Sequence, residues 1–306
     1  MKTHQKVIQA SLAIASLFAI VAGISSCSKN SDPISGEVAQ TASNEAAVNA
    51  QTSEVDDVAT NQMNATDIAP GRAESSSFDD DRVKCATVVK TPSTDKLSGV
   101  ITIDFGTTGC TDSKGNIRKG KITITWNNSS LSKRWYEAGA THTITFTGYS
   151  INGVKFSDAD SRTVTNVSTP NSPLTFNIVA THNLTWPDNS TSSRTMHITR
   201  QWVRSATVTD DKLIFSQTAG SDNAAAGTNR HGKVYTIKIT TPLEYSRACA
   251  ISNKVFKPVK GVMVITYDTS KTITIDFGTG TCDNTFTITA GGASRVVTSK
   301  NDSTDD

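Results

Sequence analysis

The chain has 306 residues, of which 36% are apolar, 19% charged and 6% aromatic, with a formal net charge of +2. Threonine is abundant, with 45 residues, and proline is rare, with 8. These figures exclude a collagen, a coiled coil and a membrane protein with several spans, because the chain has only one long apolar run. They predict an exported, β-rich protein of one or two domains.

The N-terminus has the pattern of a lipoprotein signal peptide. Lys2 and Lys6 precede an apolar stretch that runs from Val7 to Ile24, as in the n-region and h-region of an export signal. The stretch ends in Ile24-Ser25-Ser26-Cys27, which resembles the bacterial lipobox. We therefore predict a signal peptide over 1–26 and lipidation of Cys27. The alternatives are an ordinary cleaved signal and a single transmembrane helix.

Acyl chains on Cys27 would hold the protein on a bilayer without a spanning segment. Ser28, and not an aspartate, follows the cysteine. By resemblance to bacterial sorting rules, this favours the outer membrane. The sequence leaves open whether the protein occupies the periplasmic face or the cell surface.

The segment after the cysteine is acidic and poor in large apolar side chains. Residues 28–81 contain 11 acidic and 2 basic residues, a net charge of −9, and one aromatic residue, Phe78. Such a composition buries too little apolar area to offset the chain entropy lost on folding. We predict a disordered acidic tether over 27–81; the alternative is a loosely ordered arm lying on the domain.

The remainder of the chain has the opposite charge. Residues 82–306 contain 26 basic and 17 acidic residues, a net charge of +9. The bases are scattered along predicted strands, which favours a solvated, mildly basic surface over a specific contact with anionic lipid or acidic polysaccharide. No nucleic-acid partner is predicted, because no stacked aromatics accompany the bases.

Alternation of apolar and polar residues predicts an all-β body over 82–298, followed by a flexible acidic tail over 299–306. The turn signals include Asn152-Gly153 and Trp186-Pro187-Asp188-Asn189. Short turns without crossover helices indicate an antiparallel meander of about a dozen strands. A sandwich and a curved half-open sheet both fit this pattern. The alternating runs are 101–105, 121–126, 141–147, 235–240, 272–277 and 285–289.

Two segments of the body resemble each other. Cys85 is followed by Asp104-Phe105-Gly106-Thr107 and Cys110, and Cys249 is followed by Asp276-Phe277-Gly278-Thr279 and Cys282. This repeat predicts two related units, in which both Asp-Phe-Gly segments have structural roles. Four cysteines in an oxidising compartment should pair. Of the three connectivities, the repeat favours Cys85–Cys110 and Cys249–Cys282. The alternative is a metal site formed by the four thiolates, but the sequence lacks the short cysteine spacings that such a site needs.

With these segments, the chain resembles uncharacterised outer-membrane lipoproteins of Bacteroidota. The resemblance also includes Arg162-Thr163-Val164-Thr165-Asn166 and the run from Gly227-Thr228-Asn229-Arg230 to Leu243. It implies an envelope lipoprotein of that phylum. It implies no activity, so no catalytic residue follows from it.

Few residues suggest chemistry. His142 and His182 share the apolar parity of their strands, which fits core residues better than a metal or acid–base pair. Trp126, Trp186 and Trp202 also share that parity. The common hydrolase, zinc-protease and phosphate-loop motifs are missing from the sequence. We therefore predict no catalytic residue, cofactor or metal site.

The one speculative ligand contact is Arg134-Trp135-Tyr136, where aromatics next to bases in a loop-like stretch would grip a sugar ring or a headgroup if they are exposed. The alternative is that these aromatics belong to the core.

The function expected from the sequence is a non-enzymatic binding or scaffolding module at the outer membrane. Its partners would be the membrane, through the lipid anchor, and a glycan, a lipid or an envelope protein. One alternative is a carrier of a hydrophobic ligand on a curved sheet. A second alternative is a glycan-active enzyme with two carboxylates in a cleft.

Overall fold

The alternating segments form one antiparallel sheet in the computed structural model, which describes residues 34, 36–70, 80–268 and 270–298. The predicted signal peptide, Cys27 and the predicted tail over 299–306 lie outside these residues. The sheet is the curved alternative of the two architectures expected for the all-β body, because all strands belong to one continuous meander.

The sheet has 16 strands and follows the chain closely, so most neighbours in the sheet are also neighbours in sequence. The main path runs from β1 to β16; β7 pairs with β5 and β8, β11 with β9 and β12, and β3 with β4. The strands are β1 (Thr87–Pro92), β2 (Ser98–Asp104), β3 (Cys110–Thr111), β4 (Ile117–Asn127), β5 (Thr141–Ile151), β6 (Val154–Phe156), β7 (Ser161–Asn166), β8 (Leu174–Thr185), β9 (Thr191–Val203), β10 (Lys212–Gln217), β11 (Ala225–Thr228), β12 (Val234–Ser246), β13 (Lys260–Tyr267), β14 (Lys271–Thr279), β15 (Thr285–Ala290) and β16 (Ala293–Thr298).

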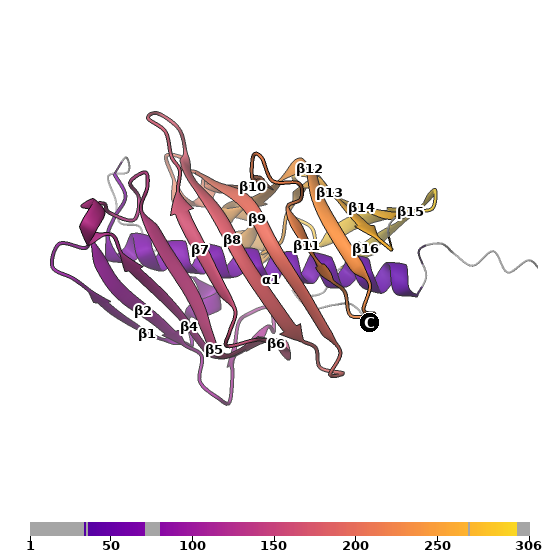
Figure 1. Cartoon of the computed structure of the whole chain (residues 1–306), viewed down its shortest axis with the longest axis horizontal. Coiled ribbons are helices and arrows are strands. Elements are labelled where there is room, and N and C mark those ends of the chain that lie inside the picture. Colours follow the sequence, from indigo (N-terminus) through magenta and orange to yellow (C-terminus); the bar gives the residue numbers. More distant parts are fainter. Residues whose placement is uncertain (1–33, 35, 71–79, 269, 299–306) are drawn as a thin grey trace, which may run out of the picture. The chain divides into compact units, whose positions relative to one another are not determined.

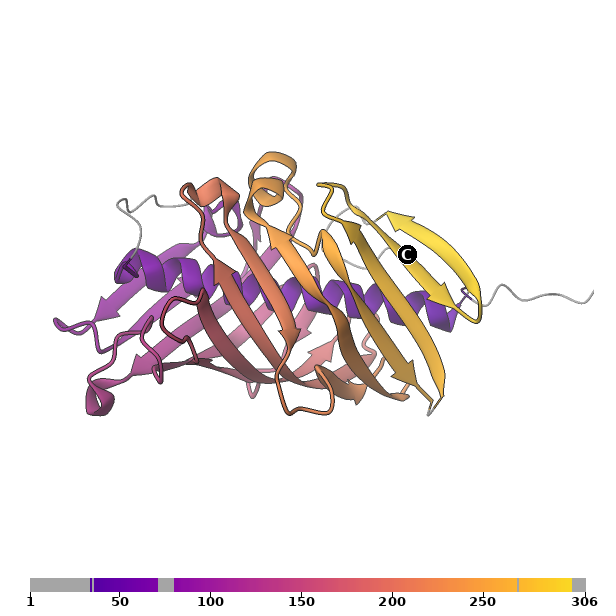
Figure 2. The ribbon, with the colours of Figure 1, turned by 90° about the horizontal axis from the view of Figure 1, so that it is seen from above.

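A 30-residue helix, α1 (Glu37–Thr66), lies along the inner face of this sheet. In Figure 1 strands β7, β8 and β9 pass in front of α1, while β14 and β15 lie behind it. Figure 2, seen from above, shows the C-terminal strands crossing the other side of the same helix. The sheet therefore curves around α1, and 19 of the 30 helical residues are buried.

The prediction of a disordered tether over 27–81 is wrong for the residues of α1. The segment contains no glycine or proline, and its many alanines favour a helix. It lacks an apolar stripe, so the amphipathic pattern that reveals most surface helices is missing. Contacts with the sheet supply the burial that the composition did not predict.

The two parts of the sheet that enclose α1 also contact each other. Lys114, in the turn between β3 and β4, donates to the backbone oxygen of Lys254 at 2.7 Å and to Oδ1 of Asn284 at 3.0 Å. These contacts join the first and last thirds of the body across 140 and 170 residues of sequence.

The inner face of the sheet is apolar where the alternation predicts it. Ile101, Ile124, Ile144 and Ile275 are fully buried. Trp126, Trp186 and Trp202 are each 3% exposed, which confirms their predicted place in the core.

The sequence repeat corresponds to a repeated local structure. In each unit the aspartate lies at or near the end of a strand. Its carboxylate accepts from the backbone N–H of the glycine two residues later: Asp104 accepts from Gly106, and Asp276 accepts from Gly278, each at 2.9 Å. Both glycines have positive φ, 71° and 86°, which an L-residue adopts only with strain. The structural role predicted for the Asp-Phe-Gly segments is therefore confirmed.

Both predicted disulfides, Cys85–Cys110 and Cys249–Cys282, are present, one in each unit. The body also contains short helical segments that the alternation did not reveal: α2 (Arg247–Asn253) and the 3-10 turns η1 (Asp81–Val83), η2 (Ser129–Leu131) and η3 (Val208–Asp210). Ser246 caps α2 by accepting from the N–H of Cys249.

Gly120 offers a test of this packing. It has φ +75° at a bulge between β4 and β5, and a Cβ there would lie 2.2 Å from the oxygen of Gly148. Gly120→Ala should lower the free energy of unfolding by roughly 3 kcal/mol or more, because it adds a backbone clash to left-handed strain. Gly148→Ala is the control: φ is +56°, but a Cβ meets nothing within 4 Å. Its expected cost is about 1 kcal/mol. If urea unfolding shows that both variants lose the same free energy of unfolding, the close approach of β4 and β5 is contradicted.

Candidate functional site

Buried arginines on the inner face of the sheet and in two short helical segments contact α1. We call the following residues the inner arginines: Arg82 of η1, Arg118 of β4, Arg162 of β7, Arg194 and Arg200 of β9, and Arg247 of α2. Each is at most 8% exposed. A buried charge is costly unless it is paired, so the partners of these side chains determine how α1 is held.

Glu54 of α1 receives a bidentate contact from Arg118. The Nε and Nη2 atoms of Arg118 donate to the two carboxylate oxygens of Glu54 at 2.7 and 2.9 Å. The third donor, Nη1, contacts Asp112 at 2.8 Å, and Asp112 also accepts from the backbone N–H of Asn116. This fork geometry fixes both the position and the rotation of α1 at this point.

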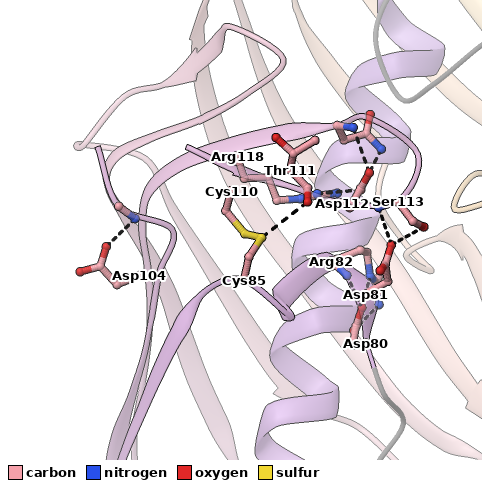
Figure 3. Close-up of a disulfide and its surroundings, with 12 residues drawn as sticks. Asp80, Asp81, Arg82, Cys85, Asp104, Cys110, Thr111, Asp112, Ser113 and Arg118 are labelled. Carbon is pink, nitrogen blue, oxygen red and sulfur yellow. Dashed lines mark hydrogen bonds and ion pairs between the residues drawn. A yellow bond between two sulfur atoms is a disulfide. The ribbon is translucent and has the colours of Figure 1, made fainter. Parts of the chain in front are cut away.

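A disulfide lies beside this pair. Figure 3 shows Cys85–Cys110 between η1, which carries Arg82, and the turn that carries Asp112 and leads into β4 with Arg118. Asp81 of η1 accepts from the backbone N–H and the hydroxyl of Ser113 at 2.8 and 2.6 Å. The crosslink therefore holds two arginine-bearing segments next to each other, so that both reach α1.

Asp56 contacts two inner arginines. Its carboxylate accepts from Nε and Nη2 of Arg162, the former at 3.0 Å. The remaining terminal nitrogen of Arg162 lies 2.7 Å from Nε2 of His182. The backbone oxygen of Asp56 accepts from Arg200 at 2.7 Å, and the guanidinium of Arg200 stacks on Phe176, 4.9 Å from the ring centroid.

Asp57 joins α1 to two short helical segments, η1 and α2. It accepts from Arg82 and from Arg247, the latter at 3.0 Å. Burial alone would raise the pKa of Asp57, but Arg247 and Arg82 outweigh it and hold this pKa below its ordinary value. The carboxylate therefore stays ionised in the interior.

The contacts are looser towards the N-terminus of α1. Arg194 donates to Asn49 at 2.9 Å, but its nearest carboxylate oxygen, on Glu45, is 3.7 Å away. Burial raises the pKa of Glu45, and Arg194 offsets this only in part. Some guanidinium N–H groups of Arg194 and Arg200 have no hydrogen-bond partner among the described residues.

The prediction of a solvated basic surface is therefore wrong for the inner arginines. A sequence signal for them exists: Arg162 has the same strand parity as Val164, and Arg194 and Arg200 have the parity of Met196 and Ile198. Arginine at an inward position needs an acidic partner, and the acidic segment before residue 81 supplies it. Only the two signals together predict that these arginines are buried and paired.

The two inward histidines are core residues beside the inner arginines. Burial and the charge of Arg200 lower the pKa of His142 to about 3. Burial and the charges of Arg162 and Arg194 hold the pKa of His182 well below its ordinary value. Both imidazoles are therefore neutral at physiological pH, and both side chains are at most 4% exposed.

The speculative ligand contact at Arg134-Trp135-Tyr136 lies at the C-terminal end of α1. Trp135 is only 2% exposed, stacks on Phe176 and donates through Nε1 to the oxygen of Asp67 at 2.7 Å. Arg134 pairs with the carboxylate of Asp67. The hypothesis of an exposed ring is therefore wrong for Trp135, which holds the end of the helix.

The surface offers a different candidate for ligand contact. A hollow of about 620 Å³ lies where β6, β8, β9 and β11 meet. We call it the polar hollow, because eight of its ten lining residues have polar side chains, although apolar atoms form slightly more than half of its surface. Its polar residues are Lys155, Ser157, Asn183, Thr185, Thr191, Ser192, Ser193 and Thr228.

Within the described residues, no group of three or more His, Cys, Asp or Glu side chains has an arrangement suited to a metal ion. In the same part of the chain, no helix combines the length and apolar character needed to cross a membrane. Comparison with protein-family models, with curated proteins and with solved structures finds no match to this chain.

Glu54→Gln tests the pairing of α1 with the sheet. It leaves Arg118 buried with one fewer counter-charge, so the free energy of unfolding should fall by about 3 kcal/mol or more. Lys212→Ala is the control, because Lys212 is 47% exposed and its pair with Glu244 lies at the surface; such pairs contribute at most about 1 kcal/mol. If both variants lose a similar free energy of unfolding in urea titrations, a central role for the Glu54–Arg118 pair is contradicted.

The buried histidines predict a pH dependence. The pKa values of His142 and His182 are lower in the folded than in the unfolded protein, so folding favours their neutral forms. The contribution of the neutral imidazoles to the free energy of unfolding is complete above about pH 6.5 and is lost as the pH falls towards 3. His142→Gln should reduce the slope of unfolding free energy between pH 6 and 4 by up to about 1.4 kcal/mol per pH unit. The control is His231→Gln, which alters an exposed imidazole. An unchanged slope in His142→Gln would refute the assignment.

Proposed function

We propose that this protein is a lipid-anchored protein of the outer membrane and acts there as a non-enzymatic binding or scaffolding module. The lipobox-like Ile24-Ser25-Ser26-Cys27 supports the anchor. The two disulfides support an oxidising compartment outside the cytoplasm. The resemblance to envelope lipoproteins of Bacteroidota is consistent with both.

The interior of the body supports a structural use of its ionisable groups. The carboxylates of Glu54, Asp56 and Asp57 are each bound by inner arginines. A glycan-active enzyme needs two carboxylates that are free to act in a substrate cleft. Glu54 and Asp57 do line a cavity, but it measures only about 30 Å³ and inner arginines bind both carboxylates. A carrier of hydrophobic ligands needs an open apolar inner face, and α1 occupies that face. Both alternatives therefore have less support than binding at the outer surface.

The observation that carries the binding role is the polar hollow. Its volume of about 620 Å³ is in the range of small-ligand sites, and its hydroxyl and amide groups can both donate and accept hydrogen bonds. Glycans present hydroxyl groups of the same kind. Of the partners expected from the sequence, a glycan fits this surface better than a hydrophobic ligand does.

The anchor is tested by Cys27→Ser. The wild-type chain should enter the detergent phase in a phase-separation assay, and its N-terminal peptide should carry acyl groups in mass spectrometry. Cys27→Ser should move the chain to the aqueous phase, because the acyl chains supply the membrane affinity. An unmodified Cys27 in wild-type protein would contradict the proposal.

The binding role is tested with glycans released from the bacterial envelope. Thr191→Trp places a bulky side chain in the polar hollow and should weaken binding at least tenfold. Thr163→Trp is the matched control, since Thr163 is also an exposed strand residue but does not line the hollow. If wild-type protein binds no envelope glycan, or if both variants bind as wild type does, the hollow is not the binding site.

A further inference from the structure

The distance available between the lipid anchor and the folded body is short. Ile34 is 1% exposed and belongs to the main apolar core, and α1 begins at Glu37. Only six residues, 28–33, separate Cys27 from Ile34. Seven Cα–Cα steps span at most about 25 Å even when the chain is fully extended. An anchor at Cys27 would therefore keep the N-terminal end of α1 close to the bilayer.

The surface at this end of the body is formed by turns between strands. Asn229 donates to the hydroxyl of Thr41 at 3.4 Å, and Arg230 donates to Oδ1 of Asn44 at 3.1 Å, which places the 229–233 turn beside the first turns of α1. The turn between β13 and β14 is its neighbour, because Tyr235 pairs with Tyr267. We call the turn 229–233, together with Asp268 and residues 270–271, the proximal end.

The opposite end of the body lies at the C-terminus of α1. A 30-residue helix is about 45 Å long, and its last turn contacts Trp135 and Arg134 through Asp67. Figure 1 shows the two ends of α1 at opposite ends of the sheet. A tether that reaches about 25 Å from Ile34 can bring the proximal end to the membrane far more easily than the opposite end.

The chemistry of the proximal end fits an anionic lipid surface. Lys233 and Lys271 are 45% and 63% exposed and share one carboxylate, Asp268, at 4.0 and 3.5 Å. Arg230 is paired with Asp188, and Glu37 lies in the first turn of α1. Next to Lys233, Val234 is 70% exposed. Two lysines with one shared counter-charge and an exposed apolar side chain suit the headgroup region of a bilayer.

We propose that the protein stands on the membrane with its proximal end against the phospholipid headgroups and the loop around Leu131 pointing away. This orientation rests on the proposed lipid anchor at Cys27. It also places the polar hollow near the membrane, because the 186–190 turn that adjoins the hollow accepts hydrogen bonds from Arg230 through Ser190 and Asp188.

The orientation is tested with the full-length lipoprotein in vesicles of phosphatidylethanolamine and phosphatidylglycerol. A fluorophore is attached to Lys233→Cys or, as the control, to Leu131→Cys, which is 54% exposed at the opposite end. A nitroxide on the lipid headgroups should quench the fluorophore at 233 at least threefold more than the one at 131. Equal quenching, or stronger quenching at 131, would overturn the orientation.

A second variant tests the role of the tether. Insertion of 20 glycine and serine residues after Asn30 should leave the protein bound to vesicles but reduce quenching at 233 at least twofold. Unchanged quenching would overturn the claim that the short tether positions this end. If the wild-type lipoprotein does not sediment with vesicles, the lipid anchor is refuted and the orientation with it; sedimentation without selective quenching refutes the orientation alone.

Discussion

The structure depends on the pairing of a polar helix with arginines inside a curved sheet. Glu54 and Asp56 of α1 are buried and Asp57 is largely buried, so that an unpaired carboxylate at these positions would be strongly destabilising. Inner arginines from distant parts of the body bind each of the three. Such pairs add little net stability compared with apolar packing, but they form only at the correct distance and orientation of the two side chains. A helix shifted by one residue would replace Glu54 with Ser53 or Val55 opposite Arg118 and leave this arginine without its carboxylate on α1. The pairs therefore fix the register of α1 against the sheet, while apolar residues such as Val55, Val58 and Met63 contribute burial.

This arrangement explains the division of charge along the chain. The acidic N-terminal segment and the basic body have net charges of −9 and +9 by sequence count, and much of this difference is used within the molecule. The two disulfides support the same arrangement: Cys85–Cys110 joins the segments that carry Arg82 and Arg118, and Cys249–Cys282 joins α2, which begins at Arg247, to the turn after β14.

The strands were predictable because their signal is local. Ile101-Thr102-Ile103 alternates within a few residues, and Asn152-Gly153 specifies its own turn, with both residues at positive φ. The disulfide pairing followed from the repeat around Asp104 and Asp276. The burial of α1 was not predictable from its composition, because the partners of the helix are distant: Arg118 is 64 residues from Glu54, Arg162 is 106 residues from Asp56, and Arg194 is 145 residues from Asn49. The helix lacks an apolar stripe because arginines, and not only apolar side chains, face it.

Amide hydrogen exchange of the full-length protein, measured for each segment, tests most directly whether α1 is buried inside the sheet. If α1 is held inside the sheet, amides of residues 45–60 should exchange as slowly as those of central strands such as β8 and β9, because they open only with the whole fold. Exchange of residues 45–60 at the rate of an unstructured chain, with the strands still protected, would show that the acidic segment is a free tether and would contradict the account.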